Sequence, residues 1–233
     1  MSPPMRTTSS GAMVKSMMFH TASTARREVV VTADHVELPG ALAVPAGAIG
    51  TVVFAHGSGS SWTSPRNTRV AEILGGARLA TLLFDLLTPA EADNRRNVFD
   101  VPLLAGRLAA ATAWLRADDE LGPLPLGYFG ASTGAAAALW AAAEDPGVRA
   151  VVSRGGRPDL ARRRLAAVRA PTLLIVGSFD PVVLDLNEEA RLFLHCECAL
   201  RIVPGATHLF EEPGTLAAAA ELARDWFLDH LGG

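Results

Sequence analysis

The sequence predicts an α/β domain with a mostly parallel, doubly wound sheet that carries helices on both of its faces. Short aliphatic segments alternate with longer helical segments from Arg27 to the end of the chain. This alternation is typical of βαβ units, in which parallel strands lie side by side under packed helices. Hydrophobic residues make up 49% of the 233 residues, which is enough to bury both faces of such a sheet. No linker or repeat divides the chain, so we expect a single domain over residues 27–233.

The elements are expected in a regular order. A hairpin opens the domain, with residues 27–36 and 41–44 as its strands and Pro39-Gly40 as its turn. The other strands are expected at residues 51–55, 79–84, 124–129, 148–153, 172–176 and 199–203, and the helices at 64–77, 102–116, 133–143, 158–168, 182–194 and 214–231. In such a sheet ligands bind at the carboxyl ends of the strands, which is therefore where functional residues are sought.

The first 26 residues are rich in Ser, Thr and Met and show no hydrophobic periodicity. We expect them to form a disordered leader. The apolar stretch within them is broken and too short for a signal peptide. No apolar run approaches the ~20 residues that a membrane span needs. These observations predict a cytoplasmic protein.

The charge distribution argues against several classes of partner. The formal net charge is −3, and no cluster of Lys and Arg dominates any segment, so nucleic acid and membrane are not expected as partners. The two cysteines, Cys196 and Cys198, are too close together for a disulfide framework. No metal-ligand spacing occurs, so no metal is expected. The protein is expected to be a monomer or a homodimer that binds a small molecule.

A candidate nucleophile lies at the end of the strand at 124–129. Residues 130–134 read Gly-Ala-Ser-Thr-Gly, and a helix is expected to follow at once. A G-x-S-x-G pattern between a strand and a helix is typical of a nucleophile elbow. The serine on that tight turn needs small neighbours, which Gly130 and Gly134 supply. The sequence therefore predicts Ser132 as the nucleophile.

A serine hydroxyl needs a base, and the base needs a group to orient it. His208 lies in the loop between the last strand and the last helix, and Asp180 follows the strand at 172–176. Both loops should reach the edge of the sheet that carries Ser132, in the chain order Ser, Asp, His. Asp180 precedes Pro181 and a helix, so an N-cap is the other interpretation of this residue. Asp185 and Asp159 are the alternative acids.

An oxyanion hole is expected beside the nucleophile. Acyl transfer needs two N–H donors directed at the developing negative charge. One is expected from Thr133, which follows the nucleophile, and the other from Ser58, or failing that Gly59, in the glycine-rich loop after the strand at 51–55. His56 is expected to brace this loop.

Together, His56-Gly57, residues 130–134, Asp180 and His208 resemble the α/β-hydrolase superfamily. The segments VVSRGG and GATHLF resemble its dienelactone hydrolase-like branch. The resemblance implies an α/β-hydrolase fold and no cofactor. Dienelactone hydrolases carry a cysteine nucleophile, whereas this chain has Ser132, which favours general ester chemistry.

Two residues are candidate substrate contacts. Dienelactone hydrolases use arginines to bind an anionic group, so Arg154 is a candidate contact. The alternative is a surface arginine that pairs with Asp159 or with a backbone carbonyl. Trp62 either forms a wall of the pocket or packs on its own loop. Only four residues separate the strand at 148–153 from the next helix, which leaves no room for a cap domain. The polar loop at 88–100 is the one segment able to act as a partial lid.

The sequence therefore predicts an esterase that cleaves small carboxylic esters through an acyl-enzyme. The same triad would also serve a thioesterase, a peptidase or an acyltransferase. A binding protein that has kept the hydrolase architecture is the alternative from another class.

Overall fold

The computed structural model of the protein describes residues 26–232. The leader expected over residues 1–26 lies, apart from Arg26, outside these residues. Within the described part, none of the helices combines the length and the apolar character that crossing a bilayer requires.

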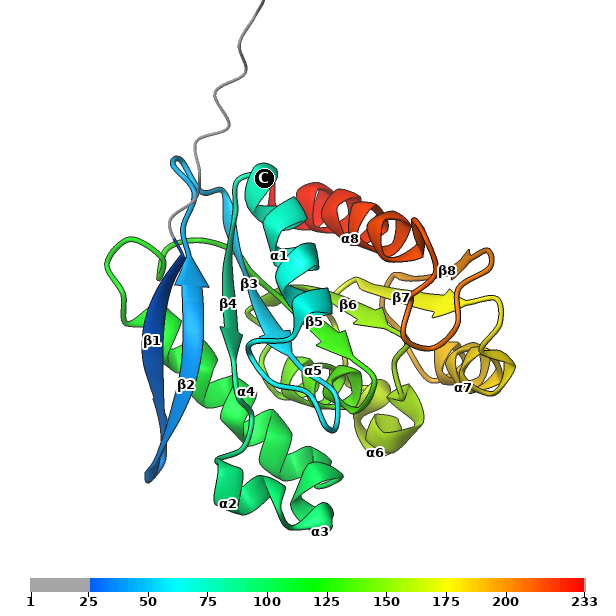
Figure 1. Ribbon diagram of the computed structural model, residues 1–233, viewed down its shortest axis with the longest axis horizontal. Coiled ribbons are helices and arrows are strands. Elements are labelled where there is room, and N and C mark those ends of the chain that lie inside the picture. Colours follow the sequence, from blue (N-terminus) through cyan, green and yellow to red (C-terminus); the bar gives the residue numbers. More distant parts are fainter. Residues whose placement is uncertain (1–25, 233) are drawn as a thin grey trace, which may run out of the picture.

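One eight-stranded sheet runs through the domain (Figure 1). Its strand order is β1-β2-β4-β3-β5-β6-β7-β8. The strands β1 and β2 are antiparallel and β2 is antiparallel to β4, whereas all pairs from β4 to β8 are parallel. The predicted mostly parallel α/β sheet is therefore confirmed. The strands are β1 (Arg26–Ala33), β2 (Val36–Ala43), β3 (Gly50–Ala55), β4 (Leu79–Phe84), β5 (Leu126–Ala131), β6 (Val148–Arg154), β7 (Thr172–Gly177) and β8 (Cys198–Val203).

The hairpin turns at a different place from the one expected. Asp34, with a left-handed φ of 52°, and His35 make the turn, and Pro39-Gly40 lies inside β2. Gly40 is needed there because a Cβ would lie 2.6 Å from the Leu83 carbonyl oxygen in β4. The glycine thus marks a close approach of two strands, which the sequence alone does not distinguish from a turn.

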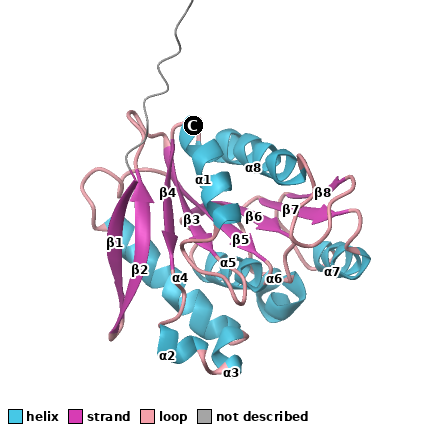
Figure 2. Cartoon of the chain, viewed as in Figure 1, coloured by secondary structure: helices cyan, strands magenta, loops and turns pink. Residues whose placement is uncertain are grey.

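Helices cover both faces of the sheet (Figure 2). Helices α1 and α8 pack together on one face, and α4 and α5 pack together on the other. Each pair covers its own hydrophobic core, and almost all residues of β3, β4, β5 and β7 are buried between the two. The helices are α1 (Pro65–Gly76), α2 (Pro89–Ala92), α3 (Arg95–Val98), α4 (Val101–Arg116), α5 (Thr133–Glu144), α6 (Arg162–Leu165), α7 (Pro181–Arg191) and α8 (Thr215–Leu231).

Two segments differ from the elements expected. The polar loop at 88–100 contains α2 and α3, each of a single turn. Thr88 and Glu91 form a capping box and the Asn94 side chain caps α3, so local side-chain bonds produce turns that hydrophobic periodicity does not reveal. The helix expected at 158–168 is instead a 3₁₀ turn followed by α6, because the tighter first turn breaks the 3.6-residue period.

Candidate active site

The three residues predicted as a triad lie on loops at the carboxyl edge of the sheet. Ser132 follows β5, Asp180 lies just beyond β7, and His208 lies beyond β8. The strands β5, β6, β7 and β8 are consecutive in the sheet, so the ends of β5 and β8 are separated by only two strands. Parallel strands thus bring together residues that are 76 positions apart in the chain.

Ser132 lies on a strained turn between β5 and α5. Its backbone angles are φ 51° and ψ −121°, a combination that residues with a side chain rarely adopt. The glycines two positions away on either side have no room for a Cβ, which at Gly130 would collide with the Ala135 backbone and at Gly134 with the Ala55 carbonyl. The sequence pattern therefore forms the sharp elbow that the strand and helix around it predicted.

A chain of hydrogen bonds joins the three residues. His208 Nδ1 lies 2.6 Å from Asp180 Oδ2, and His208 Nε2 lies 3.3 Å from Ser132 Oγ. With Nδ1–H donating to the carboxylate, Nε2 is free to accept the proton of the serine hydroxyl. The Asp180 side chain is 14% exposed and that of His208 is 37% exposed, so the carboxylate is sheltered while the imidazole borders the solvent.

The structure separates the two interpretations of Asp180. This residue occupies the N-cap position of α7, yet its side chain makes no capping hydrogen bond. Its carboxylate is directed to His208 instead. Of the alternative acids, Asp159 binds the Arg157 guanidinium through two hydrogen bonds of 2.8 Å, and Asp185 is exposed on α7. Asp180 is therefore the carboxylate that the fold brings to the imidazole.

The two residues expected to supply the oxyanion hole lie against each other. The Ser58 N–H donates to Thr133 Oγ1 across 3.0 Å. Gly57 lies so close to the nucleophile that a Cβ there would be 3.0 Å from Ser132 Cβ. The loop after β3 and the first turn of α5 therefore form one wall beside Ser132, and Gly59 adopts a left-handed φ of 69° within that loop.

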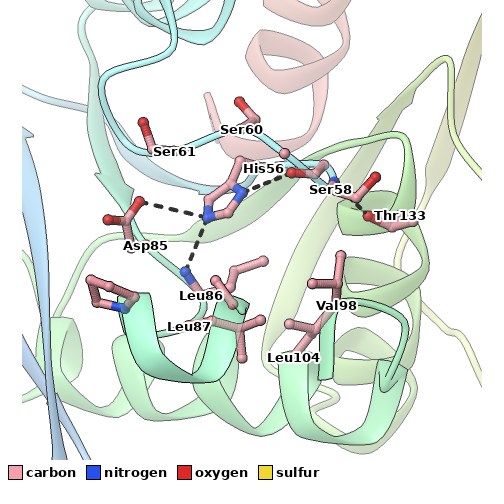
Figure 3. Close-up of a pocket in the computed structure, with 14 residues that line it drawn as sticks. His56, Ser58, Ser60, Ser61, Asp85, Leu86, Leu87, Val98, Leu104 and Thr133 are labelled. Atoms are coloured by element: carbon pink, nitrogen blue, oxygen red, sulfur yellow. Dashed lines mark hydrogen bonds and ion pairs between the residues drawn. The ribbon is translucent and has the colours of Figure 1, made fainter. Parts of the chain in front are cut away.

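His56 braces the same loop, as expected. Its Nδ1 lies 3.0 Å from the Gly57 carbonyl oxygen, and the Leu86 N–H donates to its Nε2 across 3.1 Å (Figure 3). Because Nε2 accepts a hydrogen bond, Nδ1 carries the proton. Burial lowers the pKa of His56, which keeps this ring neutral and the two bonds intact. The ring thereby ties the loop after β3 to the end of β4.

Two cavities flank this loop. The catalytic cavity, about 200 Å³ in volume, opens onto Ser132 and His208 and has a largely polar wall that includes Arg66, Asn67 and Arg154. The second cavity, about 260 Å³ in volume, lies on the other side of Ser58 and Thr133. Figure 3 shows His56 and Asp85 at its polar end and Leu86, Leu87, Val98 and Leu104 along its apolar side.

The candidate substrate contacts have different surroundings. Arg154 lines the catalytic cavity, is only 7% exposed and makes no ion pair with Asp159, so the alternative of a surface pair is wrong. Trp62 lines neither cavity; it packs against the core under α1, and the Arg26 guanidinium lies 5.4 Å from the centre of its ring.

Two residues that the sequence does not predict as substrate contacts line the cavity. Arg66 and Asn67 begin α1 and also line the catalytic cavity. The sequence indicates only their role at the start of the helix, because the direction in which a helix points its first turn depends on tertiary packing. Across residues 26–232, no group of three or more His, Cys, Asp or Glu side chains is arranged to hold a metal ion.

Comparisons with known proteins give the family. No protein-family model matches the chain. A dienelactone hydrolase from Anabaena variabilis is 54% identical, with a TM-score of 0.86 over 89% of this chain and 99% of that one. The esterase Est1E from Butyrivibrio proteoclasticus, at 15% identity and a TM-score of 0.76 over 88% of this chain and 99% of that one, shares the fold.

Two curated relatives from Mycobacterium tuberculosis strains carry the name "Putative phosphoribosyl transferase". Each is 62% identical over 208 residues, which are 88% of this chain and 47% of the relative. The chain thus spans about half the length of these relatives. The Anabaena enzyme, in contrast, is matched over nearly its whole length. The chain belongs to the dienelactone hydrolase-like branch of the α/β-hydrolase superfamily.

Proposed function

We propose that the protein is a serine esterase that hydrolyses small carboxylic esters through an acyl-enzyme. The observation that carries the proposal is the hydrogen-bond chain from Ser132 through His208 to Asp180, which begins at a strained elbow. A serine held in this way is the arrangement that acyl transfer requires. The family of the chain, a hydrolase family, supports the same chemistry.

In the first half of the reaction, His208 Nε2 accepts the proton of the Ser132 hydroxyl while Oγ attacks the ester carbonyl. The carbonyl oxygen becomes an oxyanion, which the Thr133 N–H and a second N–H from the loop after β3 stabilise. The Ser58 N–H acts as that second donor only after it leaves Thr133 Oγ1, to which it donates in this structure. His208 then gives its proton to the departing alcohol oxygen, and the acyl group stays on Oγ. Asp180 holds the imidazole in the required tautomer and stabilises its charged form.

The second half repeats these steps with water. His208 takes a proton from a water molecule, the hydroxide oxygen attacks the acyl carbon, and the Ser132 Oγ leaves with the proton that His208 returns. The products are a carboxylic acid and a free serine. Each proton moves through one imidazole nitrogen, so no other acid or base is needed.

The two curated relatives are named for a phosphoribosyl transferase activity, which differs from ester hydrolysis. The 208 matched residues make up 47% of those proteins, so the activity in their name can belong to the half that this chain does not match. The residues around Ser132 are arranged for acyl transfer, and we therefore assign ester hydrolysis to this part. Thioester, amide or acyl-transfer chemistry would use the same residues.

The test is labelling with a fluorophosphonate, followed by peptide mapping, together with p-nitrophenyl acetate turnover. We expect the label on Ser132 and a loss of about 10⁴-fold or more in kcat for Ser132→Ala. Ser153→Ala is the matched control, because Ser153 is buried at the end of the neighbouring strand and its hydroxyl has no partner within residues 26–232. An unlabelled Ser132, or a Ser132→Ala variant with most of its activity, would overturn the proposal.

A further inference from the structure

The catalytic cavity contains a guanidinium group that has no partner in the described part of the chain. Arg154 is 7% exposed, and its Nε and Nη1 atoms are buried without a hydrogen-bond acceptor. It belongs to none of the ion pairs found within residues 26–232. Burying a charge without a partner is costly. Because the Arg154 side chain also lines the catalytic cavity, an anion bound there would compensate its charge.

The surroundings of Arg154 compensate only part of this cost. Its guanidinium carbon lies 5.9 Å from the centre of the Phe129 ring and 5.8 Å from that of the Phe210 ring. Cation–π contacts of this kind are weaker than an ion pair. Burial, with a smaller contribution from Arg66, lowers the pKa of Arg154 to about 10. The group therefore remains charged at neutral pH.

Further donors face the same cavity. The first turn of α1, a 12-residue helix, lines it through Ser64, Arg66 and Asn67. A helix N-terminus favours anions through its dipole and its free N–H groups. In α1 the first residue is Pro65 and the Asn67 N–H donates to the capping Ser64 Oγ, so the Arg66 N–H is the donor left for an anion. Arg66 binds Glu211 through Nη1 at 2.9 Å, which leaves its other nitrogens available. The Ser60 residue adds a hydroxyl to the wall.

We propose that this cavity selects esters that carry a phosphate group, with Arg154 as the principal binding residue and Arg66 and the N-terminus of α1 as the secondary ones. Two guanidinium groups and a helix N-terminus suit a dianion with several acceptor oxygens better than a carboxylate with two. The inference rests on the proposed function, because it names the substrate class of the same site.

The first experiment measures binding without turnover. Isothermal titration of inorganic phosphate into Ser132→Ala, at constant ionic strength, is expected to show one site. Combining Arg154→Met with Ser132→Ala should weaken phosphate binding by about 10- to 100-fold, the range that corresponds to hydrogen bonds to a charged group. Arg149→Met is the matched control, because Arg149 lies on the same strand but is exposed. Absence of phosphate binding, or equal loss in both variants, would overturn the proposal.

The second experiment uses stability. In phosphate-free buffer, Arg154→Met should raise the Tm by a few degrees, because it replaces an unpaired buried charge with an apolar side chain between two phenyl rings. Arg154→Lys keeps a charge and should keep part of the phosphate binding. If Arg154 served only to pack against Phe129 and Phe210, then Arg154→Met would lower the Tm and leave phosphate binding unchanged, and the proposal would be wrong.

The third experiment compares three acetate esters: acetylated glycerol 3-phosphate, monoacetin and acetoxyacetate. We expect the highest kcat/KM for the phosphate ester, and we expect Arg154→Met to remove this preference. Hydrolysis of all three with no preference for phosphate would overturn the phosphate site and leave the esterase intact. Phosphate binding at Arg154 with no hydrolysis by Ser132 would overturn the esterase and leave the phosphate site intact.

Discussion

The Ser58 N–H donates to the hydroxyl of Thr133 across 3.0 Å. The two residues belong to different elements, the loop after β3 and the first turn of α5, and this bond fixes the distance between them. Thr133 is expected to present its own N–H to the oxyanion, whereas the Ser58 N–H is occupied by the Thr133 hydroxyl in this structure. The Thr133 side chain therefore holds in place the loop that forms a wall beside the nucleophile.

This contact predicts the effect of Thr133→Val. The substitution keeps the shape of a buried side chain and the Thr133 N–H but removes the acceptor for Ser58. We expect kcat for p-nitrophenyl acetate to fall about 5- to 15-fold, the equivalent of one hydrogen bond at about 1–1.5 kcal/mol, with little change in KM. Thr133→Ser keeps the hydroxyl and should keep the rate. Equal kcat in Val and wild-type enzymes would show that the bond does not matter.

Asp180→Asn should distinguish the two possible roles of Asp180, which are orienting the His208 imidazole and capping α7. Because the carboxylate binds His208 and makes no cap bond, we expect kcat to fall by about 10⁴-fold while the Tm changes little. Asp185→Asn, on the exposed side of the same helix, serves as the control and should change neither. A lower Tm with an unchanged kcat would instead assign Asp180 to the helix.

Short acyl chains should be the best substrates. No segment folds over Ser132 between β6 and the turn at Pro158–Ala161, so long chains would extend into solvent and gain little of the ~0.8 kcal/mol per buried methylene. We expect kcat/KM on p-nitrophenyl esters to peak at roughly two to six carbons. A palmitoyl ester that exceeds the butyryl ester in a detergent-free assay would refute the small-ester assignment and leave the triad untouched.

Stability should decrease in weak acid because of His56. Burial lowers the pKa of His56 below the 6.5 of an unfolded chain, so the unfolded state binds the proton first. The contribution of His56 to stability is complete above pH 6.5 and is lost as the pH falls toward its folded pKa. We expect the Tm of the wild type to fall between pH 7.5 and 5.5. His56→Gln, which cannot be protonated, should reduce that slope.

A second group, Asp85, acts in the opposite direction. Burial raises the pKa of Asp85, so protonation of Asp85 favours the folded state, opposite in sign to the effect of His56. Differential scanning fluorimetry in a single buffer mixture gives the slopes directly. Parallel curves for the wild type and His56→Gln would show that another group controls the acid transition.

The parts of the fold that were predicted correctly depend on local patterns. Buried strands such as β4 and the strand–turn–helix around Ser132 are visible as aliphatic runs and paired glycines, and chain order alone points to Asp180 and His208. The parts that were missed depend on contacts distant in sequence. The sequence predicts a turn at Gly40 because its close contact with Leu83 depends on the pairing of two strands. The burial of Arg154 likewise results from Phe129 and Phe210 on other elements.

The segment between β4 and α4 holds neither a member of the triad nor an expected oxyanion donor, yet Leu87, Ala92 and Val98 in it form part of the wall of the second cavity. Its two single-turn helices lie at the edge of the domain, whereas Leu86 and Leu87, which precede them, belong to the core under α4 and α5. Substitutions in it can thus reshape the space beside the nucleophile without straining the elbow. For directed evolution, this is the region where a library can shift substrate range at the lowest risk to the reaction chemistry.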